Sequence, residues 1–136
     1  MGADRIARAA HAALALLAQV GDRLVLEIPL AWEPRRPPDR LAAIEVYPAA
    51  TLIARGIPSG GYKKPANVRR WEIIASLRAD GVGFPADASP FAVDVDVLDA
   101  ALCVVAGADF LAGNVAAPPD PERARKEGWI WTRPRA

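Results

Sequence analysis

Four acidic residues stand where apolar residues are expected, and their types and spacing could hold metal ions. Glu27 lies in the segment VLEIP and Glu45 in IEVYP, each near the end of an apolar run that a proline closes. Asp96 and Asp99 are three residues apart in a later apolar segment, a spacing that places both on one face of a helix. These four are the candidate catalytic and metal-binding residues.

Carboxylate oxygens are the ligands that Mg²⁺ and Mn²⁺ prefer in proteins. Two such ions about 4 Å apart can activate a water molecule and stabilise the leaving oxygen of a phosphodiester. The acidic set therefore predicts metal-dependent phosphodiester hydrolysis with Mg²⁺ or Mn²⁺ as cofactor. The alternative is structural: the aspartates cap and solvate the start of a helix, and the glutamates pair with arginines at strand ends.

Basic residues gather in and after the loop PSGGYKKP. Lys63 and Lys64 belong to this basic group. Arg69 and Arg70 either extend this basic group or form the solvent face of a helix. Cys103, the single cysteine, falls within an apolar helical stripe and is interpreted as a small core residue.

Hydrophobic periodicity indicates the elements that must position these residues. Apolar residues recur at helical spacing in three segments, and a fourth segment, closed by Gly56, could form a short helix. Continuous short apolar runs indicate strands. The predicted helices cover residues 4–20, 49–55, 66–79 and 94–111, and the predicted strands cover residues 23–28, 41–47 and 127–132. Residues 80–90 and 118–126 are predicted to connect them without regular structure.

The predicted strands over residues 23–28 and 41–47 are continuous, mostly apolar runs and do not alternate with polar residues. This pattern is typical of strands covered on both faces by helices. The predicted fold class is therefore α/β, with a small sheet between helices. Ligands of such sheets bind at the carboxyl ends of the strands, where Glu27 and Glu45 would converge. A sheet of two or three strands is marginal unless helices or another chain complete it.

Length and composition narrow the class of protein. A chain of 136 residues with 52% hydrophobic residues predicts one domain, residues 1–136, with a core of its own. A net charge of +1 argues against a protein that coats nucleic acid by bulk charge. One cysteine excludes an internal disulfide framework and fits a cytoplasmic location. No apolar run reaches the roughly 20 residues of a membrane-spanning helix, so no membrane partner is expected.

Four motifs in register resemble the family called domain of unknown function 429. The motifs are IEVYPAATL, GYKK, DVDVLDAALCVVAG and EGWIW, and the similar region runs from Leu24 to Thr132. The resemblance implies a predicted nuclease with a ribonuclease H-like fold, N-terminally shortened, with a small mixed sheet and helices on both faces. That fold opens with three antiparallel strands, the first of which carries an aspartate that bridges the metals. This chain begins at what corresponds to the helix that follows them.

The resemblance also implies roles for individual residues. Glu27 corresponds to the acid of the fourth strand, Glu45 to the acid of the fifth, and Asp96 and Asp99 to the acids of the last helix. Lys63 or Lys64 corresponds to a basic group that faces the phosphate. Because the first-strand aspartate has no counterpart, the alternative is a non-catalytic module that binds nucleic acid or protein. A second copy of the chain could then pair through the exposed edge of the sheet.

Overall fold

The chain divides into two compact units in the computed structural model. Unit 1 comprises residues 1–32 and 38–43, and unit 2 comprises residues 33–37 and 44–136. The structure describes residues 3–35, 41–65 and 68–134, with the backbone alone for residues 3–7. Each unit is described by itself, and the single domain expected from the length stays a prediction.

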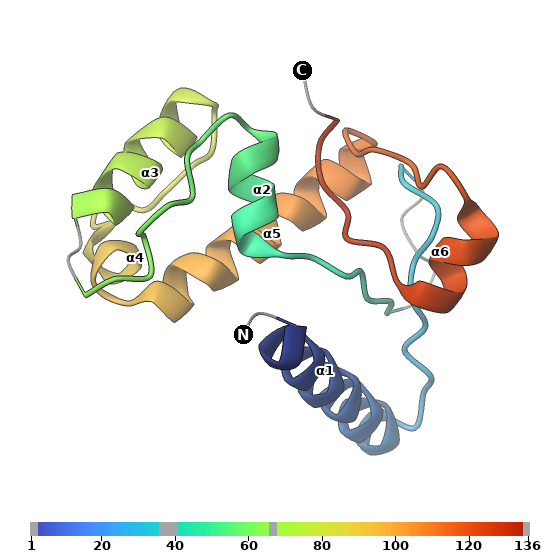
Figure 1. Cartoon of the computed structure of the whole chain (residues 1–136). Helices are drawn as coiled ribbons and strands as arrows, with labels where there is room; N and C mark the ends of the chain where they lie inside the picture. The colour runs from blue at the N-terminus through green and yellow to red at the C-terminus, as the bar shows by residue number, and fades with distance from the viewer. Residues whose placement is uncertain (1–2, 36–40, 66–67, 135–136) are drawn as a thin grey trace. The chain divides into compact units, whose positions relative to one another are not determined.

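Unit 1 is built on one long helix, α1 (Ala3–Leu24) (Figure 1). Alanine and leucine, both strong helix formers, dominate its sequence. The helix predicted over residues 4–20 is therefore confirmed, and it continues for one more turn. The strand predicted over residues 23–28 is wrong, because Arg23 and Leu24 belong to that last turn. A short apolar run such as RLVLEI fits a helix end as well as a strand, so periodicity alone could not decide.

The C-terminus of α1 is closed by two backbone hydrogen bonds. The N–H of Leu26 donates to the carbonyl of Gly21 at 3.0 Å, and the N–H of Val25 donates to the carbonyl of Asp22 at 3.3 Å. This pair of bonds is the Schellman arrangement, which requires a left-handed residue just after the helix. Val25 takes that position with φ 53°, although a β-branched side chain is disfavoured there.

Among the described residues, a single β-bridge remains of the predicted sheet. Leu30 and Ala43 form an isolated parallel bridge. Its two hydrogen bonds run from the N–H of Ala43 to the carbonyl of Pro29 at 2.9 Å and from the N–H of Ala31 to the carbonyl of Ala43 at 2.7 Å. The segment predicted as the strand 41–47 thus contributes a single bridged residue.

The predicted α/β class, with a ribonuclease H-like small mixed sheet, is contradicted. Within the described ranges the regular structure consists of helices, and no strand longer than the isolated bridge occurs. The physical reason is the size of the expected sheet. Two or three short strands bury too little surface to form a stable sheet, and Pro29 and Pro48 bound the extended runs.

Unit 2 contains five helices among its described residues. They are α2 (Pro48–Ala54), α3 (Val68–Ala79), α4 (Ser89–Val93), α5 (Val95–Ala112) and α6 (Pro121–Glu127). The predicted helices 49–55, 66–79 and 94–111 are confirmed as α2, α3 and α5, and residues 66 and 67 lie outside the described residues. Helices α2 and α4 pack against α5, and α3 packs against α4 (Figure 1).

The hydrophobic core lies among α2, α3, α4 and the first half of α5. Its members are fully or almost fully buried, as expected for aliphatic side chains between packed helices: Leu52, Ile57, Tyr62, Ile73, Ile74, Leu77, Ala88, Ala92, Leu98 and Leu102. Asp94 caps α5, since its side chain accepts a hydrogen bond of 2.8 Å from the N–H of Asp96. Gly113 ends the same helix at φ 73°, a conformation that glycine adopts without strain.

The two predicted connectors and the last predicted strand need correction. Helix α4 begins in the first connector and α6 occupies the second, where Asp120 acts as N-cap and Pro121 as the first helical residue. Residues 128–132 are not a strand, although the N–H of Trp131 donates to the carbonyl of Glu45 at 3.0 Å. No helix in the described part of the chain has the combined length and apolarity needed to cross a bilayer.

Candidate active site

The site is built around Asp99, in the second turn of α5. Its Oδ1 accepts a hydrogen bond of 2.7 Å from the hydroxyl of Tyr62, and its Oδ2 forms an ion pair of 2.9 Å with the Nζ of Lys63. Asp99 lies three residues after Asp96 on α5, so the two aspartates share one face of the helix. Two predicted site residues from different parts of the sequence, Lys63 and Asp99, are thereby in direct contact.

Tyr62 and Lys63 belong to the loop that precedes α3, and a buried arginine holds this loop. The Arg70 guanidinium donates to the carbonyls of Tyr62 at 2.7 Å and of Lys64 at 2.8 Å. It also donates to the carbonyls of Ala92 and Val93, the last two residues of α4. Arg70 is 3% exposed, so its interpretation as a solvent-face residue is wrong. These hydrogen bonds fix the loop relative to α3 and α4.

Burial and the carboxylate of Asp99 together determine the protonation of the site. Burial raises the pKa of Tyr62 well above its usual range, and the hydrogen bond to Asp99 and the charge of Asp99 raise it further. Tyr62 therefore remains a neutral hydrogen-bond donor. Burial also raises the pKa of the Cys103 thiol, one helical turn after Asp99, with a smaller contribution from the Asp99 charge. Cys103 is therefore no activated nucleophile, and it is half-buried.

Of the remaining predicted residues, Asp96, Lys64 and Glu45 belong to unit 2. Asp96 is exposed in the first turn of α5, and Lys64 is exposed in the loop next to Lys63. Glu45 belongs to unit 2, where its Oε2 accepts a hydrogen bond of 3.1 Å from the N–H of Trp129. A side chain at Gly128 would put its Cβ 2.7 Å from that oxygen, so the glycine allows this close approach.

Glu27 belongs to unit 1. It lines a shallow cavity of about 460 Å³ between the end of α1 and the residues that follow it. The other lining residues are Leu17, Ala18, Gly21, Asp22, Leu26 and Ile28. Asp22 is the other acidic residue in this lining, and the rest is apolar.

The donor set fits a divalent cation through two carboxylates at most. No group of three or more histidine, cysteine, aspartate or glutamate side chains within the described residues is arranged to hold a metal. A two-ion site with all four predicted acids stays a prediction. Asp96 and Asp99 alone suit Mg²⁺, which commonly uses one or two carboxylates and keeps several water molecules.

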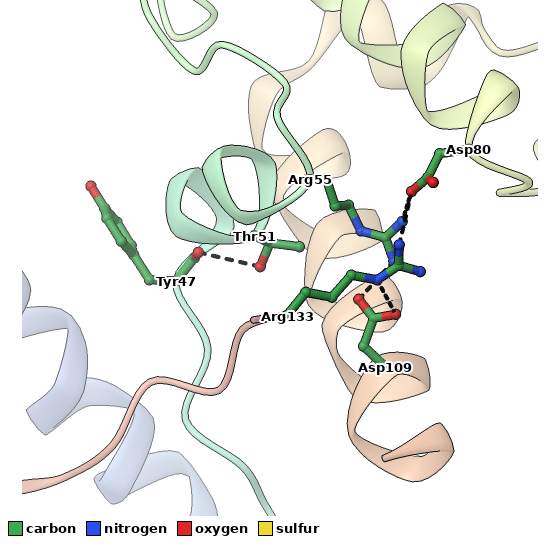
Figure 2. Close-up of polar contacts among 6 residues, drawn as sticks. All are labelled: Tyr47, Thr51, Arg55, Asp80, Asp109 and Arg133. Carbon is green, nitrogen blue, oxygen red and sulfur yellow. Dashed lines mark hydrogen bonds and ion pairs between the residues drawn. The ribbon is translucent and has the colours of Figure 1, made fainter. Parts of the chain in front are cut away.

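A second polar cluster lies at the other end of α5 and contains residues that the sequence analysis missed. Asp109 is 5% exposed and accepts hydrogen bonds from Arg55 at 2.6 Å and from Arg133 at 2.9 Å. Asp80 also contacts both arginines (Figure 2). The sequence contained a signal for this cluster, because Asp109 continues the helical stripe of Leu98 and Leu102 and an acid in such a stripe needs a buried partner.

Comparison with known proteins identifies the family of the chain, and the description of that family names no activity. Residues 3–123 match the family described as "Protein of unknown function (DUF429)". Neither a search of curated proteins nor a search of solved structures found a similar protein. The family resemblance read from the four motifs is thus confirmed over most of the chain.

Proposed function

The chain belongs to the DUF429 family of proteins of unknown function, and on this premise we propose that it hydrolyses phosphodiester bonds with a divalent cation. The observation that carries the proposal is the contact of Lys63 with Asp99, three residues after Asp96 on the same helix. The contact of one candidate metal ligand with a candidate phosphate-binding residue supports this proposal, because a metal-dependent phosphodiesterase needs both groups near the phosphate.

Asp96 and Asp99 would hold the cation, and Mg²⁺ and Mn²⁺ are the ions whose preferences they meet. When bound, such an ion stabilises charge on a phosphate and lowers the pKa of a coordinated water molecule. Lys63 and Lys64 would bind the phosphate oxygens of the substrate. Tyr62 would orient the Asp99 carboxylate through its hydrogen bond. Roles for Glu27 and Glu45 as further ligands stay predictions.

A second candidate function is a non-catalytic module that binds nucleic acid or protein. It is favoured by the hydrogen bond that ties Glu45 to Trp129 and by the lack of a three-donor group among the described residues. In unit 1, Gly21 is the only buried residue among those whose burial is described, and several large apolar side chains are exposed. Exposed apolar surface of this kind is typical of interaction surfaces. Pairing of two copies of the chain stays a prediction.

Cleavage of labelled DNA and RNA oligonucleotides in Mn²⁺ separates the two functions. We expect the wild type to cut at least one substrate and Asp99→Asn to lose at least tenfold in rate, because the variant removes a metal-ligating charge. Glu122→Gln on α6 is the matched control, since it removes an exposed carboxylate remote from the site in sequence. Oligonucleotide binding without cleavage would contradict hydrolysis and support the binding module. Neither binding nor cleavage would contradict both nucleic-acid functions.

A further inference from the structure

The two partners of Asp99 differ in their freedom to leave it. Tyr62 is 2% exposed, is part of the hydrophobic core and belongs to the loop that Arg70 holds. The Lys63 side chain is 55% exposed and reaches Asp99 from solvent. Its ammonium also lies 5.4 Å from the centre of the Tyr62 ring, within the range of a cation–π interaction. Thus Oδ1 of Asp99 has a fixed partner, whereas Oδ2 has a removable one.

A cation already lies where a metal would have to bind. The Nζ of Lys63 is 2.9 Å from Oδ2 of Asp99, so a divalent ion on that oxygen would come within a few ångströms of the ammonium. Two cations at such a distance repel each other strongly even at the high effective dielectric of a protein surface. The ammonium and the metal therefore exclude each other at this oxygen.

We propose that Lys63 is the resting counterion of Asp99 and competes with the divalent cation for its carboxylate. This inference rests on the proposed function, because it concerns the metal that hydrolysis would use. It adds a role that metal ligation alone does not include: Lys63 neutralises Asp99 in the metal-free protein and must move away before a metal can coordinate Oδ2. A side chain that leaves Asp99 in this way is also free to reach a substrate phosphate.

Calorimetric titration with Mn²⁺ alone tests the competition. Lys63→Met removes the competing charge and keeps most of the side-chain length, so we expect Mn²⁺ to bind about tenfold more tightly than to the wild type. Lys63→Arg keeps the charge and should bind Mn²⁺ within about threefold of the wild type. Lys64→Met removes the same charge one residue away and should increase the affinity less than threefold, because charge effects at exposed positions are screened.

The outcomes distinguish failure of the inference from failure of the proposed function. Equal Mn²⁺ affinity in wild type and Lys63→Met, with the affinity lost in Asp99→Asn, would overturn the competition and keep the metal site. Equal gains in Lys63→Met and Lys64→Met would reduce the effect to general charge and also overturn it. No Mn²⁺ binding by any variant would overturn both. Lys63→Gln, a second variant that removes the ammonium, is titrated with Mn²⁺ in the same way. Circular dichroism checks that every variant is folded.

Discussion

At the residue scale, contacts between distant segments decide which predicted residues form a site. The sequence analysis selected Lys63 and Asp99 separately, one as a phosphate-binding residue and one as a metal ligand. Their ion pair depends on the packing of the loop against α5, which no local pattern encodes. Arg70 could not be identified as buried either, because arginines are mostly exposed and its partners are backbone carbonyls.

Tyr62 gives a prediction of pH dependence at this scale. Its pKa is raised in the folded protein, so the folded state retains the phenolic proton that the unfolded state loses near the ordinary tyrosine pKa of about 10. The stabilisation is present below that pH and is lost as the pH rises above it. Tyr62→Phe should lower the free energy of unfolding by about 1–2 kcal/mol at neutral pH, because it removes a buried hydrogen bond to a carboxylate.

Urea denaturation at pH 7 and at several values above pH 9 measures both effects. The wild type should lose stability more steeply with rising pH than Tyr62→Phe does. Tyr47→Phe is the control, since Tyr47 is 41% exposed and its substitution should leave the pH profile nearly unchanged. Parallel profiles for wild type and Tyr62→Phe would contradict the assignment of alkaline sensitivity to Tyr62.

At the element scale, helices were predictable and strands were not. The four predicted helices exist within a few residues of their expected bounds, and three of them show helical periodicity over a dozen or more residues, which is a strong signal. The apolar runs near residues 23–28 and 41–47 were interpreted as strands because they are short and continuous. Whether such runs form a sheet depends on further strands, and that information is not local. Helix α6 had a readable signal in Asp120 followed by Pro121, within a segment assigned to a connector.

At the end of α1, Val25 has a backbone conformation that a β-branched residue disfavours, and a single substitution should relieve this strain. Val25 is 92% exposed and left-handed, so its side chain contributes little packing while its backbone is strained. Val25→Gly should raise the free energy of unfolding of α1 by up to about 1 kcal/mol, because glycine adopts this conformation without a Cβ penalty. Thermal unfolding followed by circular dichroism at 222 nm measures the gain.

Gly21→Ala provides the opposite test at the same helix end. A Cβ on Gly21 would lie 2.7 Å from the carbonyl oxygen of Leu26, so the backbone turn that closes α1 would have to shift. We expect lower helicity and a lower midpoint in this variant, although alanine is ordinarily the better helix former. A more stable Gly21→Ala together with a less stable Val25→Gly would contradict the assigned turn.

At the scale of the whole molecule, the two units differ in what stabilises them. The hydrophobic core belongs to unit 2, whereas Gly21 is the one buried residue among the unit 1 residues whose burial is described. A chain of this length was expected to bury a core, and it does so in the part that also holds the Lys63–Asp99 contact. Glu27 and Glu45, predicted to meet at one sheet edge, belong to unit 1 and unit 2 respectively.

The cluster around Asp109 joins parts of unit 2 that are distant in the sequence. Arg55 follows α2, Asp80 follows α3, Asp109 lies on α5, and Arg133 lies near the C-terminus (Figure 2). The Arg55 and Asp109 side chains are 3% and 7% exposed, whereas Asp80 is 38% exposed. A buried charge without its partner is costly, so Asp109 should contribute more to the free energy of unfolding than Asp80 does.

Asp109→Asn should therefore destabilise unit 2 by about 3 kcal/mol, since two guanidiniums lose the carboxylate that they share. Asp80→Asn removes the same charge at a more exposed position and should cost less than about 1 kcal/mol. Urea denaturation followed by tryptophan fluorescence reports on this region, because Trp131 is buried with its ring 5.0 Å from that of Phe110. Equal losses in the two variants would mean that the cluster acts through surface charge, and would contradict a dominant role of the buried Asp109.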